Sequence, residues 1–338
     1  MAAGNRYRAG IIGCGRSGNL HARAYKKIEN IELAACANRG EGKLQEFADR
    51  WAIPGRYGDL EEMLRAESLD LVSICTKDDQ HVGPLLRTAA ARPKGIFCEK
   101  PLAASLSEVD SMLEACRAGG TKLSVSHSMR FEQNFVLAKD LGVGGELGAL
   151  REIHFVGYGM AGDMRGLLHE DHCIDFLRFC AGEPQWVSCY PDGTPEQPGL
   201  AGTIQFEGGV AARVSFGGRR DYATFQVILE CSRGRVDAVL GPDPAGSVDL
   251  LQNDCWEPTL RVWRAKDGGL AGYRDGELLK TVRNDPWELG LRELIGCIEE
   301  DGESVSSGAD SRKTVQLILA VLDSAKEQRK VIVGREDS

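Results

Sequence analysis

The sequence predicts an α/β protein with a doubly wound parallel sheet, followed by an α+β domain with a large, mostly antiparallel, open-faced sheet. Short apolar runs alternate with helical patterns up to about residue 126, as in parallel sheets with crossover helices. From residue 186 onward, short strand-like runs are separated by glycine turns, which is typical of hairpin-joined strands. A chain of 338 residues is expected to form two domains, which we place at 1–126 and 127–338.

In the first domain, apolar runs and helical periodicities follow each other in a regular order. Strands are predicted at 9–12, 31–37, 69–76, 95–98 and 122–126. Helices are predicted from the first glycine turn to about residue 28, and at 43–51, 59–66, 82–91 and 107–118. Asp59, with Glu62 three residues later, is typical of a capped helix start. This order predicts a parallel sheet with helices on both faces.

In the second domain, strand-like segments predominate. Helices are predicted at 135–141, 171–181, 287–299 and 311–329. Strands are predicted at 149–158, 186–190, 202–206, 210–216, 222–231, 234–240, 247–251 and 260–264. Such a series of short strands indicates a sheet that is joined mainly by hairpins.

The most informative motif is the glycine turn after the first strand, Gly13-x-Gly15-x-x-Gly18. Gly13 permits the tight turn, Gly15 lets the backbone approach a pyrophosphate, and Gly18 lets helix and strand pack closely. The helix that follows offers N–H groups and a positive dipole end to an anion, near Arg16 and Ser17. This strand, turn and helix predict a dinucleotide-binding Rossmann domain.

Asn38 and Arg39 follow the second strand, about 20 residues after Gly18, where the ribose of such a cofactor is usually bound. An acidic residue there would bind the ribose hydroxyls and repel a 2′-phosphate. The Arg39 guanidinium can instead hold that phosphate. The pair therefore favours NADP over NAD as the cofactor. The alternative interpretation is an arginine that only faces solvent.

Polar residues also follow the next two predicted strands. Cys75-Thr76 ends one strand, with His81 a few residues further on, and Glu99-Lys100-Pro101 ends the other. Open α/β sheets bind their ligands at such carboxyl ends, so we expect these residues to contact the cofactor. Lys100 could pair with Glu99 or act as an acid or base beside the nicotinamide.

Together, Gly13-x-Gly15-x-x-Gly18 and Glu99-Lys100-Pro101 resemble the Gfo/Idh/MocA oxidoreductase family, which includes inositol dehydrogenases and glucose–fructose oxidoreductase. Arg130-Phe131, Gly145-x-Leu147-Gly148 and His172-x-x-Asp175 extend the likeness into the second domain. The resemblance implies an NAD(P)-dependent dehydrogenase that acts on a sugar, cyclitol or related polyol. We expect the substrate cleft between the two domains.

The resemblance also assigns roles to single residues. The lysine of the family's Glu-Lys-Pro triplet is catalytic, and a histidine exchanges the hydroxyl proton while hydride moves to or from the nicotinamide. These two residues correspond to Lys100 and His172. His81 matches a family position near the cofactor or substrate, whereas His21 is expected to be structural or to lie at the rim of the cofactor site. As in the family, a homodimer or homotetramer through the C-terminal sheet is expected.

The segment before His172 departs from the family pattern, Asp-x-Gly-x-His-x-x-Asp. Leu168 stands where the aspartate partner of the histidine is expected, and Glu170 stands at the glycine. Asp171, Glu170 or Asp163 would have to supply the missing carboxylate, and we take Asp171 as the catalytic candidate. The candidate substrate-binding residues are Lys100, Arg130, Asp163, Arg165, His169 and His172. Surface salt bridges are the alternative for both arginines.

Two other functions stay open at this point. A lyase or glycosidase that uses NAD transiently is compatible with the resemblance, because oxidation beside a glycosidic carbon acidifies a proton and permits elimination. A catalytically silent cofactor-binding protein is compatible with Leu168. We expect no metal site, because His169 and His172 lie three residues apart without a third strong ligand at a suitable spacing.

The composition limits the partners and the compartment. A net charge of −9 argues against nucleic acid or an anionic membrane as the main partner. The chain starts without an apolar signal segment, and no apolar run approaches the roughly 20 residues that cross a bilayer. Eleven cysteines are scattered without a C-x-x-C pair, as buried free thiols are. We therefore expect a cytoplasmic protein with a small-molecule substrate.

Overall fold

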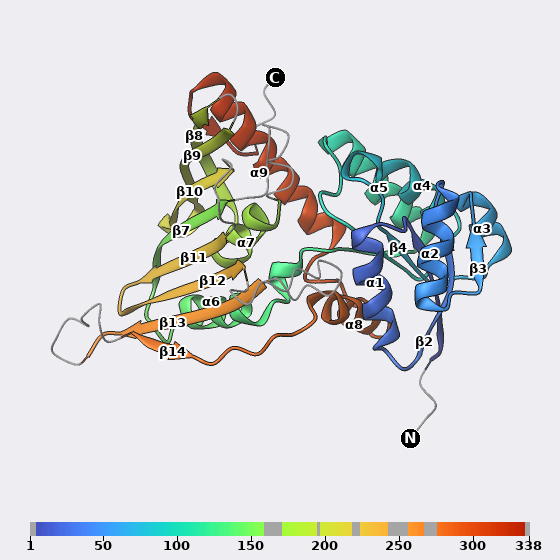
Figure 1. Ribbon diagram of the computed structural model, residues 1–338. Coiled ribbons are helices and arrows are strands. Elements are labelled where there is room, and N and C mark those ends of the chain that lie inside the picture. The colour runs from blue at the N-terminus through green and yellow to red at the C-terminus, as the bar shows by residue number, and fades with distance from the viewer. Residues whose placement is uncertain are drawn as a thin grey trace. The chain divides into compact units, whose positions relative to one another are not determined.

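The computed structural model describes residues 5–158, 171–194, 197–217, 224–242, 256–266 and 276–334. It forms two compact units (Figure 1). Among the described residues, unit 1 contains 5–128 and 285–315, and unit 2 contains the rest. Residues 285–315 thus lie in unit 1, whereas the sequence order suggested the second domain, because a helix in this segment packs on the first helix of the chain.

Unit 1 is built on a six-stranded sheet with the order β3-β2-β1-β4-β5-β6, and all its neighbouring strands are parallel. The strands are β1 Tyr7–Ile12, β2 Ile31–Ala37, β3 Gly55–Tyr57, β4 Leu71–Ile74, β5 Gly95–Cys98 and β6 Lys122–Val125. The predicted doubly wound parallel sheet is confirmed. The short edge strand β3 is an addition to the predicted elements.

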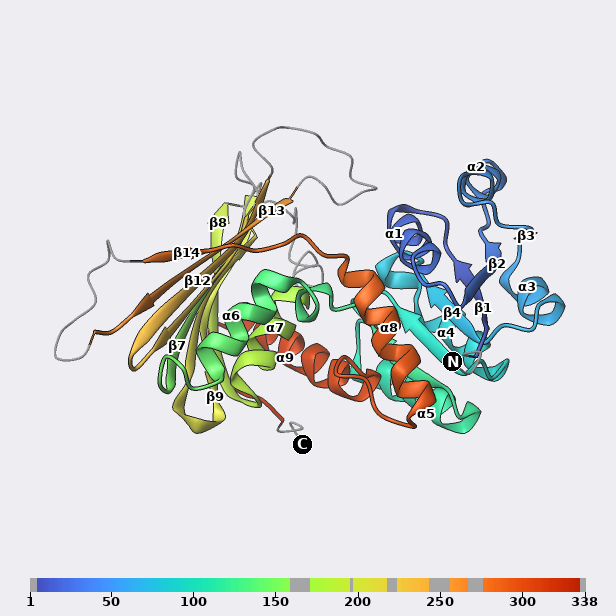
Figure 2. The same cartoon turned by 90° about the horizontal axis from the view of Figure 1, so that it is seen from below.

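The helices of unit 1 form two groups. They are α1 Arg16–Lys26, α2 Glu41–Trp51, α3 Leu60–Ala66, α4 Val82–Ala90, α5 Leu106–Gly119 and α8 Pro286–Glu299. α1 packs with α2 and α8, and α4 packs with α3 and α5. The chain runs outward from β1 to β3 and, in the opposite direction, from β4 to β6, so right-handed crossovers place α1 and α2 on one face of the sheet and α4 and α5 on the other (Figure 2). α8 packs on α1 and therefore lies on the face of α1. None of the described helices is both long and apolar enough to cross a membrane.

Unit 2 contains a nine-stranded sheet with the order β14-β13-β12-β11-β7-β10-β9-β8-β15. The strands are β7 Leu150–Tyr158, β8 Pro184–Thr194, β9 Gln197–Phe206, β10 Ala211–Gly217, β11 Thr224–Cys231, β12 Gly234–Pro242, β13 Trp256–Arg264, β14 Glu277–Leu279 and β15 Val331–Ile332. Only β7 and β10 pair in parallel, so the predicted mostly antiparallel sheet is confirmed. The strand predicted at 247–251 lies outside the described residues.

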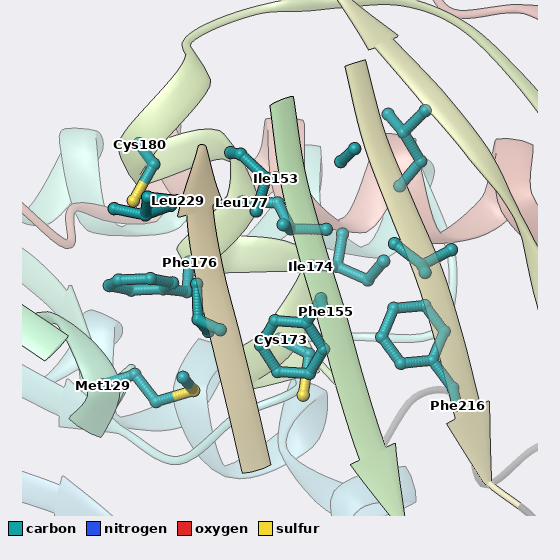
Figure 3. Packing of buried hydrophobic residues seen from close by; sticks show 14 of the residues in the cluster. Met129, Ile153, Phe155, Cys173, Ile174, Phe176, Leu177, Cys180, Phe216 and Leu229 are labelled. Atoms are coloured by element: carbon teal, nitrogen blue, oxygen red, sulfur yellow. The ribbon is translucent and has the colours of Figure 1, made fainter. Parts of the chain in front are cut away.

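Helices cover one face of this sheet (Figure 2). They are α6 Gln133–Val143, α7 Asp171–Ala181 and, from residue 316 onward, α9 Gly308–Glu327. Figure 3 shows Ile174 and Leu177 of α7 against Ile153 and Phe155 of β7, and all four side chains are fully buried or nearly so. His154 lies between Ile153 and Phe155 in β7, so its side chain points to the other face of the sheet, where it is partly exposed. No described helix of unit 2 covers that other face.

Candidate functional site

The glycine turn lies where the strand order of unit 1 reverses. β1 and β4 are neighbours whose carboxyl ends adjoin, and the chain winds outward from them in both directions. Gly13 has φ +103°, and a Cβ there would lie 2.4 Å from the Cys75 carbonyl oxygen. A Cβ on Gly18 would lie 2.2 Å from the Gly13 carbonyl oxygen. Only glycine permits these contacts between the turn, β4 and α1.

Gly15 differs from the other two glycines of the turn, because nothing lies within 4 Å of the position of a Cβ. It is the exposed N-cap residue of α1, whose first residues are Arg16 and Ser17. A side chain at position 15 would therefore fill open space beside the helix N-terminus. That space, with N–H groups and a positive dipole end facing it, fits the pyrophosphate of a dinucleotide.

A pocket of about 570 Å³ opens at this edge of the sheet. It is lined by the turns after β1, β2 and β4 and by residues near the starts of α2, α3 and α4. Six residues predicted to bind the cofactor line it: Gly13, Gly15, Asn38, Arg39, Cys75 and Thr76. Arg16 lines a smaller pocket of about 210 Å³ that shares Gly15 and Lys43 with the first.

The larger pocket carries more positive than negative side chains. Arg39, Lys43, Lys77 and Arg87 line it, and Asp59 is the one acidic residue among its described lining residues. The Asp59 carboxylate caps α3 by accepting the backbone N–H groups of residues 61 and 62. Three of these cations were not found by sequence reasoning. Lys43 follows Arg39 by four residues, in the first turn of α2, which is a usable signal, but Arg87 comes from α4, far away in the sequence.

Asn38 and Arg39 contact neighbouring parts of the pocket wall. The Asn38 side-chain oxygen accepts the backbone N–H of Cys14 at 3.3 Å, which ties the end of β2 to the glycine turn. The Arg39 guanidinium donates to the Gln80 side-chain oxygen at 2.7 Å. Both residues therefore line the pocket at the carboxyl end of β2.

His81 is buried behind the pocket and is not one of its lining residues. Its Nδ1 lies 2.7 Å from the Pro101 carbonyl oxygen, and its Nε2 lies 3.2 Å from the Thr76 carbonyl oxygen. His81 therefore links the turn after β4 to the turn after β5. This geometry supports a role in holding the two turns that flank the cofactor site.

The Glu99-Lys100-Pro101 turn directly follows β5, the neighbour of β4. Glu99 is buried, Lys100 is half-buried, and the Lys100–Pro101 peptide bond is cis. Burial, with the nearby negative charge of Glu99, raises the pKa of the Cys75 thiol well above its usual range. Cys75 lines the pocket, so the charge of Glu99 acts on a residue of the pocket wall.

In unit 2, the start of α7 holds two of the candidate catalytic residues. Asp171 is fully buried and His172 is half-buried. One turn later, the Asp175 carboxylate accepts from Nε and Nη2 of Arg130, each at 2.6 Å. The Arg130 guanidinium also lies 4.9 Å from the ring centre of Phe179. Arg130 was expected to contact substrate, but the structure places it in a buried ion pair with α7.

Asp163, Arg165 and His169 lie outside the described residues, as do Leu168 and Glu170.

A parallel sheet with a glycine turn where the strand order reverses is typical of domains that bind a dinucleotide. Residues 7–127 match the family model GFO_IDH_MocA, described as "Oxidoreductase family, NAD-binding Rossmann fold". Over these residues the chain is similar to the Gfo/Idh/MocA oxidoreductase family, the resemblance that its motifs predicted.

Similar proteins extend this likeness over the second unit. The chain is 26% identical to myo-inositol 2-dehydrogenase of Thermotoga maritima, over 96% of this chain and 98% of that protein. It is 26% identical to D-apiose dehydrogenase of Paraburkholderia graminis, over 96% and 89%. The fold is that of a putative NADPH-dependent oxidoreductase from Desulfitobacterium hafniense, with a TM-score of 0.84, 21% identity and coverage of 97% and 98%.

Proposed function

We propose that the protein is an NAD(P)-dependent dehydrogenase that transfers hydride between its nicotinamide cofactor and a CH–OH carbon of a sugar, cyclitol or related polyol. The observation that carries this proposal is the adjacency of three strand ends. The Gly13 turn after β1 lies against Cys75 after β4, and the Lys100 turn follows the neighbouring β5. The relatives named for myo-inositol and D-apiose support the substrate class.

Lys100 and His172 are proposed to handle the proton of the reacting hydroxyl. Both side chains are half-buried, so they can reach a ligand and are partly shielded from water. Asp171, fully buried beside His172 in the sequence, is proposed as the carboxylate that supports the histidine in place of the family aspartate. The bound nicotinamide would supply the hydride acceptor or donor.

Substrate contacts are proposed for Lys100 and His172, and for Asp163, Arg165 and His169. Arg130 is assigned a different role. Its buried, two-pronged ion pair with Asp175 holds α7 one turn after His172. We therefore propose that Arg130 positions the helix that carries the histidine.

The main test is turnover by the purified protein with NADP or NAD and a panel of sugars and cyclitols, followed by the absorbance of the reduced nicotinamide. We expect turnover with at least one polyol. The Lys100→Met variant should lose about 100-fold or more in kcat, because a positioned acid or base contributes that much. Absence of turnover with the whole panel, or wild-type kcat in Lys100→Met, would overturn the proposal.

NADP is proposed as the preferred cofactor because the side chains that line the pocket carry a net positive charge. Arg39, Lys43, Lys77 and Arg87 can neutralise a 2′-phosphate, and the one carboxylate there, Asp59, is occupied in capping α3. A guanidinium is well suited to a phosphate because it can donate two parallel hydrogen bonds.

This preference predicts the behaviour of an Arg39 variant. In Arg39→Ala, KM for NADP should rise about 10-fold or more, since hydrogen bonds between charged groups contribute about 1.5–3 kcal/mol, whereas KM for NAD should change little. Steady-state kinetics with both cofactors measures this. Arg56→Ala is the control, because Arg56 is paired with Asp49 away from the pocket and its loss should change neither value.

The uncovered face of the nine-stranded sheet is proposed to join copies of this chain into a homodimer or homotetramer. Along β8, Val187 and Cys189 are buried toward the helices, whereas Ser188 and Tyr190 are exposed on the open face. Tyr190 exposes 56% of its surface. A second copy would cover this face and its aromatic ring. Light scattering at micromolar concentration should give at least twice the chain mass, and a monomer would contradict the proposal.

A reducing compartment, the cytoplasm, is proposed as the place of action. All ten described cysteines are free thiols, and eight of them are buried. Buried thiols of this kind act as small apolar side chains and are compatible with reducing conditions.

A further inference from the structure

A line of hydrogen-bonded side chains in unit 1 leads to the Glu99-Lys100-Pro101 turn (the lysine turn). The Tyr25 hydroxyl lies 2.9 Å from Oγ of Ser73, which lies 2.9 Å from Nδ1 of His21. Nε2 of His21 lies 2.9 Å from Oε1 of Glu99. All four side chains are buried, and His21 and Ser73 are fully so. The line therefore ends on the residue that directly precedes Lys100.

One arrangement of protons satisfies every step of this line. The Tyr25 hydroxyl donates to Ser73, the Ser73 hydroxyl donates to Nδ1, and the Nε2–H of His21 donates to the ionised Glu99 carboxylate. The indole N–H of Trp287 reaches the same Glu99 oxygen at 3.4 Å. The carboxylate is thus held by α1 and α8 together.

His21 is also fixed by packing. Its ring centre lies 4.9 Å from that of Phe97 on β5, two residues before Glu99. α1 begins at the glycine turn, so His21 connects the helix at the phosphate end of the cofactor site to the turn that carries Lys100. Burying a carboxylate in this way is expensive, and an apolar pair of similar shape would stabilise the fold as well or better. The buried contact between His21 and Glu99 therefore points to a role beyond stability.

We propose that His21 is a positioning residue for the reaction: by holding Glu99, it fixes the backbone and direction of Lys100. This inference rests on the proposed dehydrogenase function, which supplies the role of Lys100. It assigns to the buried histidine of α1 a contribution to kcat that does not depend on contact with substrate or cofactor.

The kinetic test compares a disruptive and a conservative variant with a matched control. His21→Leu removes the donor to Glu99, whereas His21→Gln can still donate an N–H to it. His127 is the control: it is equally buried in unit 1, and its Nδ1 lies 2.9 Å from the Oγ of Ser306. His127→Leu therefore loses a comparable buried hydrogen bond, which ends on Ser306.

We expect His21→Leu to lower kcat about 10- to 100-fold, because small misplacements of a catalytic group have effects of that size. KM for the cofactor should stay within about twofold, since the pocket residues are unchanged. His21→Gln should recover most of kcat, and His127→Leu should keep it. Wild-type kcat in His21→Leu, or an equal loss in His127→Leu, would overturn the inference.

A second readout needs neither substrate nor cofactor. The backbone N–H of Glu99 donates to the Ile74 carbonyl oxygen at 2.9 Å, so its exchange with deuterated water reports on the turn. Exchange in the peptide that contains residues 99–103 should be faster in His21→Leu and unchanged in His21→Gln and His127→Leu. Unchanged exchange in His21→Leu would also overturn the inference.

The two proposals can fail separately. A wild-type protein that turns over no polyol contradicts the dehydrogenase function, while the exchange experiment still decides whether His21 holds the turn. If His21→Leu does not fold, Glu99→Met replaces it, because it keeps the length of the side chain and removes the oxygen that accepts from His21. Wild-type kcat and exchange in Glu99→Met would then overturn the inference.

Discussion

Gly15 and Gly18 lie three residues apart, but the same alanine substitution should affect them in different ways. A Cβ at Gly18 would meet the Gly13 carbonyl oxygen at 2.2 Å, so Gly18→Ala should destabilise the fold by about 1–3 kcal/mol. A Cβ at Gly15 meets nothing within 4 Å, so Gly15→Ala should cost less than about 1 kcal/mol. It should nevertheless weaken NADPH binding, because the new methyl group occupies space that the pyrophosphate needs.

Thermal unfolding and a fluorescence titration with NADPH separate the two effects. Gly15→Ala should unfold near the wild-type temperature with a Kd at least about 10-fold higher, which corresponds to about 1.4 kcal/mol. Gly18→Ala should unfold at a lower temperature. Unchanged NADPH affinity in Gly15→Ala would show that the pyrophosphate does not lie beside the glycine turn.

The positions of single residues were predictable from the sequence where a motif fixes local geometry. The spacing Gly13-x-Gly15-x-x-Gly18 specifies contacts within one turn, and Asn38 follows at a typical distance, so their place at one pocket could be foreseen. Arg87 could not be found this way, because it reaches the pocket from another helix. The partner of Arg130 could not be predicted either, because the two hydrogen bonds from Arg130 to Asp175 depend on how α7 packs.

At the scale of helices and strands, periodicity located the long elements and missed the shortest. β3 and β14 have three residues each, too few for an alternating pattern to show. The alternation of apolar and polar residues also shows on which face of the sheet a side chain lies, but it does not show which strands are neighbours. The parallel pair of β7 and β10 inside a mostly antiparallel sheet was therefore not foreseen.

The attachment of α8 to α1 predicts a pH effect on stability. Oδ2 of Asp285 accepts from Nε of Arg23 at 2.9 Å and from Nζ of Lys27 at 2.8 Å. Burial alone raises the pKa of Asp285, but these two cations outweigh it and hold the pKa below the ordinary 3.8. The ionised carboxylate therefore stabilises the folded state at neutral pH, and this contribution is lost as the pH falls through the lowered pKa.

Asp285→Asn should accordingly lower the free energy of unfolding at neutral pH by about 1–2 kcal/mol, because hydrogen bonds from charged donors are weakened. The difference from wild type should shrink as the pH is lowered from about 5 to about 2, since the carboxylate becomes protonated first in the unfolded and then in the folded wild type. Denaturant unfolding over this range measures it. A difference that stays constant with pH would exclude the ionised carboxylate as its source.

At the scale of the molecule, unit 1 is discontinuous in sequence, and this predicts how fragments behave. Trp287, Leu291 and Leu294 of α8 are buried in the core of unit 1. Each large apolar side chain contributes about 1.5–3 kcal/mol when buried, so residues 1–128 alone should lack much of their stability. Joining residues 285–315 to this fragment through a flexible linker should restore cooperative unfolding.

Circular dichroism and size-exclusion chromatography check this prediction. The joined fragment should elute as a discrete species and unfold cooperatively, whereas 1–128 should aggregate or unfold at a much lower temperature. The same joined fragment with Leu291→Asp and Leu294→Asp is the control, and it should behave like 1–128. Equal stability of all three fragments would mean that α8 adds nothing to unit 1.

The position of α8 in the chain also affects the order of events during protein synthesis. Residues 285–315 leave the ribosome only after nearly all of unit 2 has been made. Domains generally fold in the order of their synthesis, but here the first sheet is completed by a helix that is translated after most of unit 2. The unit that holds the glycine turn therefore becomes complete only after the strands β7 to β14 of the other unit have been made.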